Sequence, residues 1–206
     1  MTEITKPNLL IATSNRGKVK EIAASLGDLP LSLRFTDEYP DTSTPDESGR
    51  SYSENAIIKA RSYAKRTGLC ALADDSGLEV DRLDGAPGLR SARFGGNRAT
   101  DEDRIGLLLA DLARTRDQGR RARFVCVMVI VDPNLTTLNL AEGICEGRIA
   151  DMPAGSGGFG YDPIFIPYGY QLTFAELPVE VKNKISHRAQ ALAATREFLT
   201  HLFTVA

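Results

Sequence analysis

The sequence predicts an α/β protein with a central mixed β-sheet flanked by helices. Short apolar runs alternate with helix-like segments over the first half of the 206-residue chain, which is typical of parallel strands joined by crossover helices. The continuous apolar run Phe124–Val131 predicts a central strand that is buried on both faces. The segments after it are strand-rich and the C-terminal segment has helical spacing, so we expect both parallel and antiparallel strand pairs.

The chain opens with a predicted strand–turn–helix unit. Asn8–Thr13 is a short apolar strand, Ser14–Lys18 a polar turn, and Lys18–Leu26 has helical spacing. The amides of such a turn lie at a helix N-terminus and attract anions, and Asn15 and Lys18 add a donor and a positive charge. The GxxxxGK[ST] pattern is absent, so a phosphate-binding turn and an ordinary strand–helix connection both remain open.

A second strand, a long loop and a second helix follow. Leu31–Phe35 has strand character, and Thr36–Gly49 is an acidic, proline-containing loop that includes Glu47. Loops of this length are usually functional or disordered. The capping-box spacing of Ser51 and Glu54 predicts a helix that continues to residue 67. Lys59 on this helix could reach a phosphate, although a lysine on a helix is more often a surface residue.

The sequence Asp74-Asp75-Ser76-Gly77 is the most informative stretch. It follows the small or apolar residues Cys70–Ala73, which predict a buried strand, and we expect the strand to end at the two aspartates and Gly77 to allow a sharp turn. Ligands of α/β proteins bind beyond the carboxyl ends of strands, and paired carboxylates suit Mg²⁺. A turn in which an aspartate bonds the local backbone is the alternative. A further strand is expected over Leu78–Leu83.

The central part of the chain predicts a helix and a strand pair. Thr100–Arg114 is an amphipathic helix capped by Thr100, and Leu138–Cys145 is expected to pair with the apolar central strand. The stretch Arg114–Arg123 holds five arginines. It could bind nucleic acid, but the lack of interleaved aromatic residues and the net charge of −2 favour a solvated loop.

The glycine-rich segment Gly155–Gly160 matches the letters of a dinucleotide-binding motif but not its context. That motif must open a helix, and Pro163 and Pro167 forbid one here, which disfavours a nicotinamide-dependent oxidoreductase. A loop that approaches a ligand, with Phe159 and Tyr161 available to stack on a base, is the preferred interpretation. A flexible hairpin is the alternative.

Near the C-terminus, a short helix from Pro178 through Lys184 precedes a helix over His187–Phe203 that Ser186 is expected to cap. His187 and Arg188 place positive charge at a helix start, against the helix dipole. Such a local conflict is typical of an anion-binding site.

The composition limits where the protein works. No signal peptide pattern occurs at the N-terminus, and no apolar run is long enough for a membrane span. The three cysteines form no CxxC pair and lie in strand-like contexts, as reduced core residues do. We expect a cytoplasmic protein with neither a nucleic-acid nor a membrane partner.

Taken together, these motifs resemble the inosine triphosphate pyrophosphatase family, and most closely its bacterial dITP/XTP pyrophosphatases. The matching segments lie in the family's order along nearly the whole chain: TSNRGK at 13–18, SENAIIKA at 53–60, LADDSGLEVDRLDGAPG at 72–88, AGSGGFGYDPIF at 154–165 and KNKISHRAQAL at 182–192. The resemblance implies one domain over residues 1–206, elongated and two-lobed with a cleft, in an Mg²⁺-dependent homodimer. Mn²⁺ is a potential substitute.

The resemblance also implies roles for individual residues. Asp75 would be the catalytic residue and, with Glu47, would bind the metal. The substrate-binding residues would be Thr13, Ser14, Asn15, Arg16, Gly17 and Lys18 for the triphosphate, Ser76 beside Asp75, and Phe159, Gly160, Tyr161, Asp162, Lys182, His187 and Arg188 for the base.

The implied activity is hydrolysis of ITP, dITP and XTP, which are non-standard purine nucleoside triphosphates, to the monophosphate and pyrophosphate. The alternative is a Maf-type nucleotide pyrophosphatase that acts on other modified nucleotides.

Overall fold

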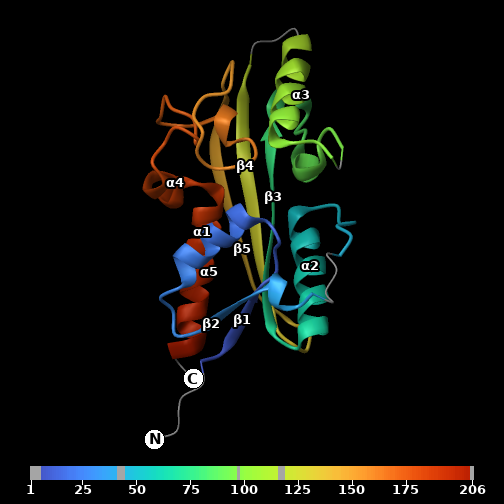
Figure 1. The fold of residues 1–206 in the computed structure, drawn as a ribbon, viewed down its shortest axis with the longest axis vertical. Helices are drawn as coiled ribbons and strands as arrows, with labels where there is room; N and C mark the ends of the chain where they lie inside the picture. Colours follow the sequence, from blue (N-terminus) through green and yellow to red (C-terminus); the bar gives the residue numbers. More distant parts are fainter. Residues whose placement is uncertain (1–5, 41–44, 97, 116–118, 205–206) are drawn as a thin grey trace, which may run out of the picture. The chain divides into compact units, whose positions relative to one another are not determined.

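The structure of the chain is a computed structural model that describes residues 6–40, 45–96, 98–115 and 119–204. In chain order its strands and longer helices are β1 (Asn8–Ile11), α1 (Arg16–Leu26), β2 (Ser32–Phe35), α2 (Tyr52–Thr67), β3 (Cys70–Val80), α3 (Asp101–Arg114), β4 (Arg121–Val131), β5 (Thr137–Ile149), β6 (Phe165–Pro167), α4 (Val179–Ile185) and α5 (His187–Thr204) (Figure 1).

The strands form one mixed sheet in the order β2-β1-β3-β4-β5-β6. β1 is parallel to both β2 and β3, while β5 and β6 are antiparallel. β4 is buried from Phe124 to Val131, as the apolar run predicts. The predicted α/β class with a mixed sheet is therefore confirmed. No helix in the described part of the chain is long and apolar enough to cross a bilayer.

The chain divides into two compact units. The first unit comprises Met1–Asp75, Val127–Glu142 and Ala191–Ala206, and the second comprises Ser76–Cys126 and Gly143–Gln190. Strands β3, β4 and β5 and helix α5 contribute residues to both units. The boundary in β3 falls between Asp75 and Ser76, so the DDSG segment is shared by the two units.

In the first unit, α2 lies on one face of the sheet and α1 on the other (Figure 1). The core here contains Leu9, Leu10 and Ile11 of β1, each at most 1% exposed. Helix α1 begins at Arg16, two positions before the predicted start. The side chain of Asn15 caps the helix and so extends it toward the N-terminus.

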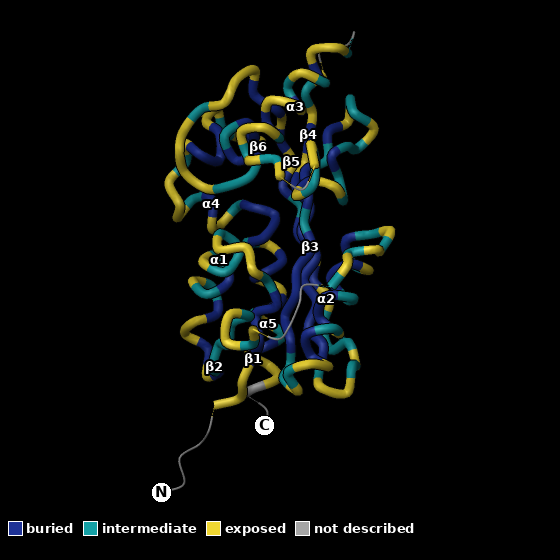
Figure 2. The backbone as a smooth tube through the Cα atoms, turned by 45° about the vertical axis from the view of Figure 1, so that its right-hand side comes forward, coloured by how far each residue is buried: buried dark blue, intermediate teal, exposed yellow. Residues whose placement is uncertain are grey.

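The prediction that a strand ends at the two aspartates is wrong. β3 continues without a turn through Asp74–Gly77 to Val80, and Figure 2 shows it mostly buried. Tertiary pairing overrides the turn propensity of the DDSG sequence: β1 pairs with β3 only as far as Leu72, and β4 is the hydrogen-bonded neighbour of β3 on its other side. The expected separate strand over Leu78–Leu83 is therefore the end of β3 followed by a short 3₁₀ turn.

The second unit has its own apolar core. The ring of Phe124 on β4 contacts Phe165 at 4.7 Å between centroids, and it stacks on the imidazole of His187 at 4.6 Å. Helix α3 adds Ile105, Leu108 and Leu112 to the same cluster. Its start agrees with the prediction, because the Asp103 amide donates to the hydroxyl of Thr100.

Candidate active site

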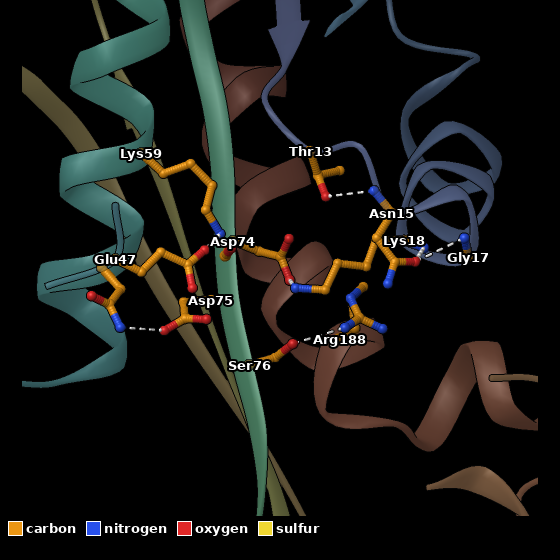
Figure 3. Close-up of polar contacts among 11 residues, drawn as sticks. Thr13, Asn15, Gly17, Lys18, Glu47, Lys59, Asp74, Asp75, Ser76 and Arg188 are labelled. Carbon is orange, nitrogen blue, oxygen red and sulfur yellow. Dashed lines mark hydrogen bonds and ion pairs between the residues drawn. The ribbon is translucent and has the colours of Figure 1, made fainter. Parts of the chain in front are cut away.

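Asp74 and Asp75 point to opposite faces of the sheet, since successive side chains of a strand alternate. The Oδ2 atom of Asp74 lies 2.8 Å from Nζ of Lys18 on α1. The Oδ2 atom of Asp75 accepts a hydrogen bond of 2.9 Å from Nδ2 of Asn55 on α2 (Figure 3). Both carboxylates are buried, at 1% and 7% exposure. The two acids are thus distinct: α1 holds Asp74 in an ion pair, and α2 orients Asp75.

Asn55 links Asp75 to the acidic loop. Its Oδ1 atom accepts the backbone N–H of Gly49 at 2.8 Å, while its Nδ2 atom donates to Asp75. The side chain is 1% exposed. Gly49 is required at its position, because a Cβ atom there would lie 2.7 Å from Oδ1 of Asn55. Asn55 therefore holds the end of the loop that carries Glu47 beside the carboxylate of Asp75.

Lys59 joins the same group of residues one helical turn after Asn55. Its Nζ lies 2.6 Å from Oε1 of Glu47 and donates to the backbone carbonyl of Asp74 at 2.9 Å. Burial alone would lower the pKa of Lys59, but the negative charges of Asp74 and Glu47 outweigh burial and raise it. Lys59 therefore stays protonated, and it is a buried residue of this cluster, not a surface lysine.

The surroundings of Asp75 raise its pKa. Burial is the main cause, and the charge of Lys59 and the hydrogen bond from Asn55 only partly oppose it. The negative charge of Glu47 adds to the rise. Glu47 and Asp75 are therefore close enough to interact, as Figure 3 shows, and their repulsion is one that a cation would relieve.

The carboxylates of Glu47 and Asp75 fit a hard divalent cation. They supply only oxygen ligands, and no set of three histidine, cysteine or acidic side chains that could hold a metal occurs within the described ranges. Two carboxylates together with substrate phosphates are a common way to hold Mg²⁺. Glu47 and Asp75 are the residues that would bind it.

The predicted phosphate turn forms the N-terminus of α1. The Oδ1 atom of Asn15 accepts the amides of Gly17 at 2.9 Å and Lys18 at 3.1 Å, and Thr13 Oγ1 accepts the Asn15 amide at 3.2 Å. Ser14 and Arg16 are exposed. Two of the amides at this helix start therefore already donate hydrogen bonds to the side chain of Asn15. The role of the turn in binding phosphate stays a prediction.

In the second unit, the glycine-rich segment is a loop that opens no helix. A single 3₁₀ turn over Asp162–Ile164 follows it, in agreement with the expected effect of Pro163. Oδ2 of Asp162 accepts the amide of Phe159 at 2.8 Å and lies 2.6 Å from Nζ of Lys182. Asp162 and Lys182 are 3% and 5% exposed. This buried ion pair holds the loop immediately beside Phe159.

Phe159 is the centre of a group of cations. Nζ of Lys182 lies 4.7 Å from the centroid of its ring, and the guanidinium carbon of Arg188 lies 5.5 Å from it. The Nη2 atom of Arg188 donates to Oγ of Ser76 at 3.0 Å. Arg188 is only 2% exposed, as α5 begins at His187 behind the Ser186 cap. The structure therefore brings together five of the predicted residues of this unit: Ser76, Phe159, Asp162, Lys182 and Arg188.

Of the remaining predicted residues of this unit, Tyr161 and His187 are buried in its core and Gly160 is partly exposed. Tyr161 is 5% exposed, and its hydroxyl donates to the backbone carbonyl of Ser91 at 3.0 Å. The ring of Tyr161 packs in the apolar cluster that contains Phe124 and Phe165, so the predicted stacking role is kept for Phe159 alone. His187 stacks on Phe124, and Gly160 donates its amide to Asp101.

The arginine stretch is a surface of ion pairs. Residues 116–118 lie outside the described residues, but each arginine that the structure describes in this stretch lies within 4.0 Å of an acid: Arg114 with Asp111, Arg120 with Asp151, Arg121 with Asp81 and Arg123 with Glu79. Paired arginines do not favour the nucleic-acid alternative, which needs unneutralised positive charge.

From the sequence, Asn55 and Asp101 had no predicted role in the site, and Lys59 was left as either a phosphate contact or a surface lysine. Asn55 and Lys59 are four positions apart in the segment SENAIIKA, and therefore lie on one face of α2 with the buried alanines Ala56 and Ala60. Polar residues on an otherwise small, apolar helix face were the available signal. No local signal identifies Asp101, because its partner lies far away in the sequence.

Comparison with known proteins identifies the family. A family model described as the Ham1 family matches residues 9–198. The dITP/XTP pyrophosphatase of Geobacter sulfurreducens is 45% identical over 191 residues, covering 93% of this chain and 96% of that protein. That of Desulforamulus reducens is 47% identical over 195 residues, covering 95% and 96%. A solved HAM1 protein from Coxiella burnetii aligns with a TM-score of 0.86 and 42% identity, covering 97% of this chain and all of that one. The resemblance found in the sequence is confirmed, and the chain belongs to the Ham1 family.

Proposed function

We propose that this chain hydrolyses dITP, XTP and ITP to the nucleoside monophosphate and pyrophosphate, and so removes these non-standard purines from the nucleotide pool. The observation that carries the proposal is the group of Asp75, Glu47 and Lys59, of which Asp75 and Lys59 are buried, together with Lys18 paired to Asp74. It combines carboxylates that could bind a metal with cations for phosphates. The relatives named above as dITP/XTP pyrophosphatases support the same substrates. They offer no support for the Maf-type alternative.

In the proposed reaction, a water molecule attacks the α-phosphorus. A bond forms from the water oxygen to this phosphorus, the bond from it to the bridging oxygen breaks, and pyrophosphate leaves. Asp75 would accept the water proton as the general base. Lys18 and Lys59 would offset the charge of the phosphates.

We further propose Mg²⁺ as the cofactor, held by Asp75 and Glu47, with Mn²⁺ as a substitute. When bound, the cation would neutralise phosphate charge and polarise the phosphoryl oxygens. Asn55 and Lys59 hold its two ligands in place, because each of them bonds both the acidic loop and β3.

Base selection is assigned to the group around Phe159. Its ring would stack on the purine, and the guanidinium of Arg188 would donate to the 6-oxygen of hypoxanthine or xanthine. Arginine has donors and no acceptor, so it can bond this oxygen but not the 6-amino group of adenine. The same argument does not exclude GTP, which also carries a 6-oxygen.

The cellular setting is also proposed, as a cytoplasmic homodimer. The three cysteines Cys70, Cys126 and Cys145 are free thiols, which is typical of a reducing compartment. The dimer is what the family resemblance implies, and light scattering of the purified protein would measure its mass.

One experiment tests the activity. Pyrophosphate release is measured from ITP, XTP, dITP, ATP, GTP and dTTP, with Mg²⁺ and with EDTA, for the wild type and for Asp75→Asn. We expect release from the first three nucleotides, which EDTA and Asp75→Asn each abolish. Asp46→Asn makes the same change at an exposed aspartate beside Glu47 and should leave the activity unchanged. Preference for dTTP, or full activity of Asp75→Asn, would contradict the proposal.

A further inference from the structure

The glycine-rich loop is bound to a residue that no predicted role includes. Asp101 is the first residue of α3, and its Oδ2 atom accepts the amide of Gly160 at 2.7 Å, across 59 positions of sequence. Its other oxygen, Oδ1, accepts Nη1 of Arg104 at 2.8 Å. Asp101 therefore ties the start of α3, through one carboxylate, to the loop.

Two successive amides of the loop donate hydrogen bonds to two different carboxylates. The amide of Phe159 donates to Asp162, and that of Gly160 donates to Asp101. Gly158 and Gly160 have φ angles of 73° and 62°, in the left-handed region that glycine adopts easily. A segment with such glycines has many accessible conformations, so external hydrogen bonds are needed to hold it in one of them.

The anchored backbone determines where the ring of Phe159 lies. The side chain of Phe159 is attached to the Cα atom that lies between the two anchored amides, so these anchors limit where its ring can lie. Nζ of Lys182 lies 4.7 Å from the ring centroid, and the guanidinium carbon of Arg188 lies 5.5 Å from it. If the Gly160 anchor were released, one side of this short segment would lose its restraint. The ring of Phe159 would then spend less time in its position against Lys182 and Arg188.

We propose that Asp101 is a positioning residue for base recognition, acting through Gly160 and Phe159 and not by contact with the substrate. This inference rests on the proposed function, in which Phe159 stacks on the purine. It predicts that loss of Asp101 weakens interactions with the base and leaves interactions with the triphosphate unchanged.

The test separates these two parts of the substrate. For Asp101→Ala we expect KM for ITP to rise about tenfold, as for the loss of one hydrogen bond to a charged acceptor, with kcat almost unchanged. The inhibition constant of inorganic tripolyphosphate, which has no base, should stay at the wild-type value. Asp101→Asn keeps an oxygen that can accept the Gly160 amide and should recover most of the ITP affinity.

Asp111→Ala is the matched control. Asp111 lies on the same helix and pairs with an arginine three positions later, Arg114, at 3.0 Å, as Asp101 pairs with Arg104. It should leave both constants at the wild-type values. An unchanged KM in Asp101→Ala, or equal losses for ITP and tripolyphosphate with a lower melting temperature, would overturn the positioning role. A wild-type protein that releases no pyrophosphate from ITP would overturn the proposed function and this inference together.

Discussion

Removal of one partner from the ion pair of Asp162 and Lys182 is expected to destabilise the second unit strongly. The two charges are 2.6 Å apart, and both side chains are almost fully buried. Asp162→Asn keeps the volume of the side chain but removes the negative charge that lies 2.6 Å from the buried ammonium of Lys182. Loss of one partner from a buried pair typically costs about 3–5 kcal/mol. For a protein of this length that corresponds to a fall in melting temperature of roughly 6–20 °C.

The intact ion pair of Asp162 and Lys182 is expected to contribute much less to the free energy of unfolding than the loss of one partner costs. In the double variant Asp162→Asn with Lys182→Met, neither position carries a charge. An apolar side chain then lies beside Phe159 and Phe174, whose rings the ammonium contacts in the wild type. Replacement of a whole buried pair by apolar groups is often close to neutral. We therefore expect the double variant to be more stable than Asp162→Asn alone.

The assay is denaturant unfolding of the wild type, both single variants and the double variant, analysed as a double-mutant cycle. Asp111→Asn, which breaks a surface pair with Arg114, is the control and should scarcely change stability. A loss below about 1 kcal/mol for Asp162→Asn would mean that water reaches the ammonium of Lys182. Strict additivity of the two single losses would equally refute the argument, because it would mean that the two charges do not interact.

Four further predictions concern the site and the thiols. Asn55→Ala should lower the affinity of the free protein for Mn²⁺, measured by electron paramagnetic resonance, since it removes the donor that orients Asp75; an unchanged affinity would contradict this. Lys18→Ala should weaken ITP binding more than IMP binding in calorimetry, and it should also reduce stability because it removes the ammonium that lies 2.8 Å from the buried carboxylate of Asp74. Equal losses for both ligands would place Lys18 away from the β- and γ-phosphates. Arg188→Ala should reduce kcat/KM for ITP far more than for ATP, and an unchanged ratio would remove Arg188 from base selection. Burial raises the pKa of Cys145 to about 12, so its thiolate is scarce at pH 8 and iodoacetamide should label it slowly until the protein is unfolded, as peptide mass spectrometry would show.

Most helix boundaries could be predicted from the sequence, because capping is local. Ser51 accepts the amide of Glu54, Thr100 that of Asp103, and Ser186 that of Ala189, each within three positions. The buried strand over Phe124–Val131 was equally readable, since eight consecutive apolar residues cannot face water. The start of α1 at Arg16 was missed, although it also rests on a local hydrogen bond, from the Gly17 amide to the side chain of Asn15.

The continuation of β3 through the DDSG segment could not be predicted from the local sequence. The DDSG sequence has every feature of a turn, and an isolated peptide would favour one. Only the sheet order, which places β4 beside β3, shows that β3 can stay extended beyond Leu72, its last partner on β1. This continuation matters for the site, because it sends Asp74 toward α1 and Asp75 toward α2.

The sequence by itself determined the fold class, the family and the chemical character of the site, because these depend on residue types and spacings along the chain. The partners of each site residue were decided only by the tertiary structure. Asn55 meets Asp75 across 20 positions, and Asp101 meets Gly160 across 59. Such contacts depend on which elements pack together and in what register, and the free energy of that packing is spread over the whole core and belongs to no short motif.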